Sequence, residues 1–336
     1  MGTIGFMDPP KTGPFNALPC FMNVPQSVDP SGSLAAILGA PFDCGMHPTR
    51  IGSRQGPAAI REQSTLVRPF QPPHAPFNVL EMLNVVDCGN ADVTSSLIEE
   101  SFEAIEAAAT LIHQAGAAPV AFGGDGSISL PLMRAAKTRY PNLSVLHIDA
   151  HTDTYRGDGN AIHHRYNVAT TFTRAAEEGT VDAAQSFHVG PRGTVMVGDV
   201  FDHTREQGYG LIPGKDLFTK GLIETAAELR AAMSGRPVYL CFDMDFFDPS
   251  CAPGVCTPTW GGASAREGLD LLHALAGIDF VAFDINTVSP PHDVGGMTAF
   301  LAATVALECL TLACFSPSIR QRIANPPAIP AQGSQT

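Results

Sequence analysis

The sequence predicts an α/β fold in which helices cover both faces of a parallel sheet. Short runs of apolar and β-branched residues alternate along the chain with longer segments of helical periodicity. The short runs are apolar almost without interruption, as expected of strands that are buried on both faces. The 336 residues, 44% hydrophobic and 16% charged, are enough to bury the large core that such a fold needs.

The predicted strands are the short apolar runs. In chain order they are Ala35–Gly39, Val85–Cys88, Pro119–Phe122, Ser144–Ile148, Gln185–Val189, Val238–Asp243 and Phe280–Ile285. Parallel neighbours need a long crossover connection, so helices are expected in the gaps between them.

The clearest helical pattern places Ile98, Phe102, Ile105 and Ile112 on one face of a helix. Other segments show the same periodicity. They are Leu130–Arg139, Thr219–Met233, Ala265–Ala276 and Thr298–Cys314.

Both ends of the chain are rich in Gly, Pro and polar residues, unlike the periodic middle. We therefore expect an irregular segment at 1–33, one α/β domain at 34–316 and a Pro-rich tail at 317–336. No basic segment leads into an apolar stretch at the N-terminus, and no apolar run reaches the ~20 residues of a membrane helix. The sequence therefore predicts neither secretion nor a membrane span.

The charge and the cysteines indicate the cellular setting. A formal net charge of -13 gives no electrostatic reason to expect nucleic acid or an anionic membrane as a partner. The eight cysteines include no CxxC pair and no zinc-ribbon spacing, so they are expected to be buried thiols of a reducing compartment. We expect a cytoplasmic protein.

Polar residues follow three of the predicted strands, at the edge of the sheet where ligands of α/β proteins bind. Residues two positions apart on an extended chain face the same side, so Asp149, His151 and Asp153 should converge, as should Asp243 and Asp245. Four carboxylates and an imidazole at one edge would repel one another or retain protons unless a cation neutralised them.

A divalent transition metal is the simplest neutraliser of this cluster. Carboxylate and imidazole without thiolate favour Mn²⁺, Ni²⁺, Co²⁺ or Zn²⁺. Each Asp taken alone could equally be a helix cap or an ion-pair partner. The occurrence of both patterns in one sheet favours the metal.

Several motifs resemble signatures of the arginase/agmatinase, or ureohydrolase, family. The chain has five such matches, in the same order as in the family. They are Gly52–Arg61 to a GxRxGPxxIR run, Gly123–Ser127 to a GGDHS turn, Asp149–Asp153 to a DAHxD strand end, Cys241–Gly254 to an SxDxDxxDPxxAPG strand, and Val288–Asp293 to an EVSPxxD run. The likeness covers about 34–316. It implies a three-layer α/β/α arginase fold with an eight-stranded, mostly parallel sheet, usually assembled into trimers or hexamers.

The resemblance also implies a site in which two metal ions hold the hydroxide that attacks a guanidinium carbon, releasing urea from an amine. By that likeness Asp149 and Asp243 are the bridging ligands. Asp153 resembles a ligand of the first metal, and His151 and Asp245 resemble ligands of the second. The metal implied is Mn or Ni.

Three positions depart from the family pattern. Gly126 stands where the family has a metal-binding histidine, and Thr287 where it has the glutamate that holds the guanidinium. Val168 falls on the family's catalytic histidine in one alignment of that region. A second alignment offers His163 or His164 as the replacement, and the sequence leaves the choice open. At most one tightly held ion per chain is expected.

These departures favour a weak or inactive subunit that supports an active paralogue. On this hypothesis the chain resembles the divergent subunit of the heteromeric metformin hydrolases, which act on a biguanide. The alternative is that the chain itself is an active metal-dependent amidinohydrolase, of the agmatinase or guanidinase type, with a rebuilt site. A metal-binding regulatory protein is a further alternative.

Overall fold

The computed structural model describes residues 19–46, 49–157 and 164–324. One sheet of eight strands has the order β2-β1-β3-β8-β7-β4-β5-β6, and every neighbouring pair is parallel. The strands are β1 (Ala35–Ala40), β2 (Val86–Asn90), β3 (Ala118–Gly123), β4 (Ser144–Ile148), β5 (Phe187–Val189), β6 (Gly210–Ile212), β7 (Pro237–Asp243) and β8 (Asp279–Asn286). The predicted α/β class is confirmed, and the sheet is entirely rather than mostly parallel.

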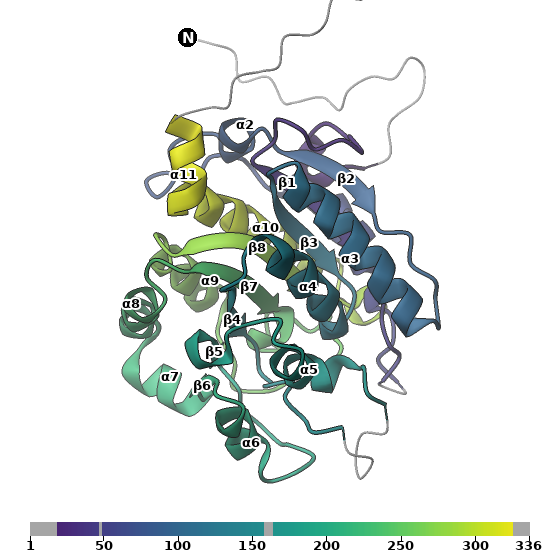
Figure 1. Cartoon of the computed structure of the whole chain (residues 1–336), viewed down its shortest axis with the longest axis vertical. Coiled ribbons are helices and arrows are strands. Elements are labelled where there is room, and N and C mark those ends of the chain that lie inside the picture. Colours follow the sequence, from purple (N-terminus) through teal and green to yellow (C-terminus); the bar gives the residue numbers. More distant parts are fainter. Residues whose placement is uncertain (1–18, 47–48, 158–163, 325–336) are drawn as a thin grey trace, which may run out of the picture.

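Helices connect the strands and lie on both sides of the sheet (Figure 1). They are α1 (Gly56–Gln63), α2 (Val79–Leu83), α3 (Ile98–Gln114), α4 (Ser129–Arg139), α5 (Thr171–Glu177), α6 (Val200–Glu206), α7 (Gly214–Lys220), α8 (Leu222–Ala232), α9 (Ala265–Ala274), α10 (Met297–Phe315) and α11 (Pro317–Ala324).

The three-layer arrangement follows from the alternation of side chains along each strand. Ile37 and Val120 face a core that includes residues of α1, α2, α8, α9 and α10. Their neighbours Leu38 and Ala121 face a second core, made with α3, α4 and α5. Both faces are therefore buried, which explains why the strands are almost continuously apolar.

The structure differs from the predicted elements in the second half of the chain. The segment Thr219–Met233, predicted as one helix, belongs to two helices, α7 and α8. They meet at Gly221, whose φ of 105° interrupts the helical backbone. The eighth strand, β6, was not predicted from periodicity because its three residues, Gly210–Ile212, are too few to show any.

The described parts of both ends pack against the domain, and the expected Pro-rich tail begins with a helix. Near the N-terminus, Phe21 is fully buried, and its backbone N–H donates a hydrogen bond to Asp87 Oδ2 at 3.0 Å. At the other end, Pro317–Ala324 forms α11 on the side of α10. Asp279 accepts hydrogen bonds from the backbone N–H and hydroxyl of Ser318, which satisfies the first turn of that helix.

Helix α10 is the most apolar segment of the chain. Its 19 residues have a mean hydropathy of 1.9, so its length and composition would suffice to cross a membrane. No apolar run of that length was expected from the sequence. In the fold it packs against β8, α1, α2 and α9, and 78% of its most apolar stretch is buried. This burial accounts for its composition.

Candidate metal centre

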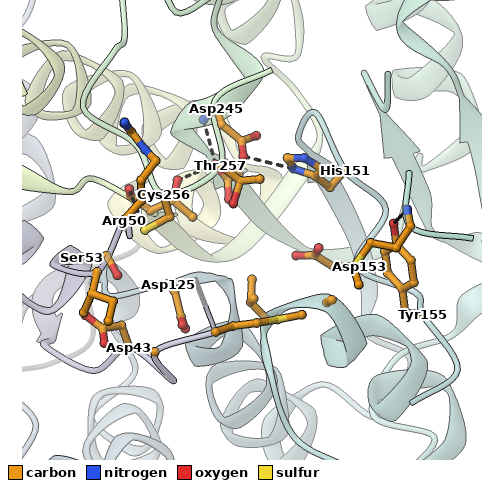
Figure 2. A pocket seen from close by; sticks show the side chains of 18 of the residues that line it. Asp43, Arg50, Ser53, Asp125, His151, Asp153, Tyr155, Asp245, Cys256 and Thr257 are labelled. Carbon is orange, nitrogen blue, oxygen red and sulfur yellow. Dashed lines mark hydrogen bonds and ion pairs between the residues drawn. The ribbon is translucent and has the colours of Figure 1, made fainter. Parts of the chain in front are cut away.

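The carboxyl ends of four adjacent strands, β3, β8, β7 and β4, bring the predicted site residues together. Asp125 follows β3, Thr287 follows β8, Asp243 ends β7 and Asp149 follows β4. Because all four strands are parallel, their ends meet at one edge of the sheet. Figure 2 shows side chains from these segments around a common cavity.

His151 lies between two buried carboxylates. Its Nδ1 is 3.2 Å from Asp149 Oδ1 and 3.1 Å from Asp245 Oδ2. One ligand atom from each of these residues lies within 4.8 Å of the others, a spacing that can hold a metal ion. Burial lowers the pKa of His151, but the charges of Asp245 and Asp149, and its hydrogen bonds to both, outweigh burial and raise that pKa well above its usual value.

Asp149 is positioned by a chain of histidines that the sequence analysis missed. His147 Nε2 lies 2.8 Å from Asp149 Oδ2, and His147 Nδ1 lies 2.8 Å from Nδ1 of His188. All three side chains are buried. Burial would raise the pKa of Asp149, but His147 and His151 lower it well below its usual range. The signal was available in principle, since His147 is two residues before Asp149 on the same face of β4.

The pKa values of the remaining carboxylates are raised, so a nearby cation would favour their ionised form. Burial and the neighbouring carboxylates raise the pKa values of Asp153 and Asp243 well above the usual range. The same causes, burial first and then Asp149, raise the pKa of Asp245 to about 6. Asp153 also has a left-handed φ of 50°, a strained conformation that is typical of functional sites. This set of donors fits a divalent cation.

Two of the departures from the family pattern lie side by side. A Cβ atom added at Gly126 would lie 3.2 Å from Asp153 Oδ2 and 3.1 Å from Val168 Cγ2. A side chain at position 126 would therefore point toward Asp153, which is the direction a ligand needs. Val168 occupies part of the space that such a side chain would enter.

Thr287, the third departure, contacts a predicted bridging ligand. Its hydroxyl donates a hydrogen bond to Asp243 Oδ1 at 2.5 Å, and its backbone N–H donates one to the carbonyl of Gly124 at 2.7 Å. Its φ of 66° is strained for a β-branched residue. Thr287 therefore ties the end of β8 to Asp243 and offers no carboxylate to the cavity.

Of the two histidines considered as replacements, His163 lies outside the described residues. His164 is exposed and borders a neighbouring cavity of about 670 Å³. That cavity shares Gly45, Met46 and Met196 with the cavity of the metal centre, but His164 does not line the latter.

The cavity above the carboxylates has a volume of about 260 Å³ and is lined by both acidic and apolar side chains. The acidic lining residues are Asp43, Asp125, Asp153, Asp243 and Asp245. The apolar lining, which sequence reasoning missed, is formed by Met46, Ile51, Tyr155, Val168, Ala169, Val195 and Met196. No local pattern marks these residues, because they come from separate loops.

Arg50 is the one arginine among the described residues of the cavity wall, and its guanidinium is already engaged. It donates hydrogen bonds to the carbonyls of Val255, at 2.9 and 2.7 Å, and Pro253, at 2.7 Å. The described part of the cavity is therefore strongly acidic, with no free guanidinium facing a ligand.

Known proteins resemble this chain over most of its length. A model of the arginase family matches residues 33–312. Guanidinopropionase of Pseudomonas aeruginosa is 36% identical over 89% of this chain and 92% of its own length. Human mitochondrial guanidino acid hydrolase is 33% identical over 89% of this chain and 82% of its own. The structure of proclavaminate amidino hydrolase from Streptomyces clavuligerus has a TM-score of 0.84 at 32% identity, covering 89% of this chain and 98% of that one.

Proposed function

The chain belongs to the arginase family, and we propose that it acts in the hydrolysis of a guanidino compound to a urea-type product and an amine. The observation that carries the proposal is the cluster of Asp149, His151 and Asp245, of which His151 and Asp245 line the cavity. The relatives support it, since they are named as a guanidinopropionase, guanidino acid hydrolases, a guanidinobutyrase and agmatinases.

The proposed cofactor is a divalent transition metal, Mn or Ni, held by Asp149, His151 and Asp245 with Asp243 and Asp153 beside them. When bound, the metal supplies Lewis-acid activation of water. The protein holds the ligands in place: His147 orients Asp149, and the backbone N–H of Asp245 donates a hydrogen bond to Asp243 Oδ1 at 2.7 Å. Because Gly126 supplies no ligand, we propose at most one tightly bound ion per chain.

The proposed substrate class is a guanidine or biguanide with apolar substituents. The acidic side chains that line the cavity favour the planar cation, and the apolar side chains that line it favour alkyl groups. A carboxylate on the substrate would find Arg50 already hydrogen-bonded to two carbonyls. This distinguishes the proposed substrate from the guanidino acids for which several relatives are named, and a metformin-like biguanide is a member of the class.

Two forms of this function are supported by different observations. Catalysis by the chain itself was the alternative of the sequence analysis. It is supported by relatives that are named as enzymes of guanidino compounds and that this chain matches over most of their length. A weak subunit that supports an active paralogue is supported by Gly126, Val168 and Thr287, which all face or adjoin the same cavity. In either form, we propose a cytoplasmic protein in an assembly of the trimer or hexamer type.

One experiment separates the two forms. The chain is purified alone, loaded with Mn²⁺ or Ni²⁺, and assayed for urea and amine release from agmatine, 3-guanidinopropionate and metformin, with Asp245→Asn as the inactive control. An ordinary enzymic rate of ~1 s⁻¹ or more establishes catalysis by the chain itself. A rate at the level of Asp245→Asn, restored on mixing with a paralogue that has an intact GGDHS turn, establishes the subunit form. Background rates in both preparations would refute the proposed function.

A further inference from the structure

Two histidines and a glutamate form a cluster outside the cavity. His74 belongs to the turn 71–75, His273 to the last turn of α9, and Glu308 to the middle of α10. One ligand atom from each lies within 4.8 Å of the others. Helix α9 follows β7 and leads into the beginning of β8, so its last turn lies toward the amino edge of the sheet. The candidate metal centre occupies the opposite, carboxyl edge.

Glu308 is the one charged residue of α10, and its side chain is only 3% exposed. Its Oε1 accepts a hydrogen bond from Gln71 Nε2 at 2.5 Å, while Oε2 lies 2.9 Å from His273 Nε2. The amide of Gln71 is fixed in turn, because its Oε1 accepts a hydrogen bond from Thr311. A buried carboxylate is costly without a compensating positive charge, which either a protonated His273 or a bound cation can supply at this position.

Each of the two imidazoles has a nitrogen that is available to bind a metal ion. Their rings stack with centroids 4.1 Å apart and an interplanar angle of 23°. Nε2 of His74 and Nε2 of His273 are both buried, and neither makes a hydrogen bond to a described residue. The 2.9 Å approach of His273 to Glu308 lacks hydrogen-bond alignment. Buried polar atoms without partners are rare in folded proteins and need an explanation.

We propose that His74, His273 and Glu308 form a second divalent-cation site, distinct from the metal centre, that takes Zn²⁺. Two imidazole nitrogens and one carboxylate oxygen are a donor set that zinc accepts, with water in the fourth tetrahedral position.

An ion at this site would stabilise the fold by linking three segments. The turn 71–75, α9 and α10 are far apart in the sequence, and one ion would join them on the side of the sheet away from the cavity. Binding to the folded chain alone stabilises it by mass action. The site is independent of the hydrolysis proposed above.

The test uses the full chain, freed of metal and titrated with Zn²⁺, with bound zinc and melting temperature as readouts. His74→Phe removes the nitrogens but keeps a ring against His273 and Phe315. His113→Phe is the matched control, because His113 is also buried with unpartnered nitrogens but belongs to no ligand group among the described residues. We expect the unmodified chain and His113→Phe to bind one more equivalent than His74→Phe, and to gain several degrees more in melting temperature on adding zinc.

Zinc in the cavity is counted in all of these proteins, so the difference isolates the second site. Glu308→Gln serves if His74→Phe does not fold, since it removes the charge but can keep the contact with Gln71, and it should lose the same equivalent. Equal zinc content in the unmodified chain and these variants would overturn the proposal. So would loss of the equivalent without loss of the zinc-dependent rise in melting temperature, because the ion would then not join the three segments.

Discussion

A Cβ atom added at Gly126 would lie between two residues that line the cavity, 3.1 Å from Val168 Cγ2 and 3.2 Å from Asp153 Oδ2. A single substitution is therefore a poor way to restore the family's ligand. Val168 Cγ2 would be 3.1 Å from a new Cβ, which is tighter than ordinary van der Waals contact.

The first prediction follows from this contact. Gly126→His combined with Val168→Ala should bind one more equivalent of Mn²⁺ than the unmodified chain, while Gly126→His alone should gain little. Hydrolysis should not rise above that of the unmodified chain in either variant, because Thr287 still provides no carboxylate for the guanidinium. Metal analysis after desalting measures the gain, with Val168→Ala as control. Full occupancy in Gly126→His alone would show that Val168 moves aside freely.

The second prediction concerns pH. Burial and Asp149 raise the pKa of Asp245 to about 6, and Asp153 and Asp243 are shifted in the same direction. A raised carboxyl pKa stabilises the metal-free fold below the unfolded value near 4, and this stabilisation is lost as pH rises through the folded pKa. For Asp245 alone the loss is about 3 kcal/mol, at ~1.36 kcal/mol per unit. His151, whose pKa is also raised, changes stability in the same direction.

The metal-free chain should therefore melt at lower temperature as pH rises from 5 to 8, whereas metal affinity should increase because the carboxylates lose their protons. Melting scans with and without a chelator measure both effects. Asp245→Asn should flatten the slope of the metal-free protein. A metal-free chain whose stability rises across this interval would contradict the assignment of protons to the buried carboxylates.

At the scale of elements, Gly221 sets the boundary between α7 and α8. Its φ of 105° is outside the conformations that other residues readily adopt, yet no atom lies within 4 Å of a Cβ added there. Gly221→Ala should therefore destabilise the fold through the backbone alone, by about 1–3 kcal/mol. Urea unfolding measures the change. Gly198 is the matched control, because it also has open space but no positive φ; Gly198→Ala should change stability little, and equal effects at both glycines would refute the backbone explanation.

At the scale of the whole molecule, assembly is the property on which the subunit form of the function depends. We propose that a chain that keeps the family's core but departs from its pattern at positions 126, 168 and 287 can still associate with other subunits. We predict that it co-purifies with a ureohydrolase-like paralogue carrying an intact GGDHS turn, in a complex of trimeric or hexameric mass. Light scattering of the separate and mixed chains measures this. A partner that forms a fully active homo-oligomer, unchanged by this chain at micromolar concentration, would contradict the prediction.

The sequence by itself determined the α/β class, most of the strands, and the grouping of Asp149, His151, Asp153, Asp243 and Asp245 at one sheet edge. These are consequences of local rules: periodicity marks an element, and spacing by two residues marks a shared face. The parallel order of the strands then brings their ends together without further information. The departures at positions 126, 168 and 287 could also be read from the sequence, because comparison with a motif identifies the residues that differ from it.

Only the tertiary structure decided which distant residues meet. Val168 closes on the space beside position 126, and Thr287 donates a hydrogen bond to Asp243. Apolar side chains from separate loops line the cavity. All of these contacts join segments that have no common sequence pattern. The cluster around Glu308 is of the same kind, and in the sequence it is a single charge within an apolar helix. Such contacts depend on how loops and helices pack across the sheet, which is a non-local property that no window of the chain contains.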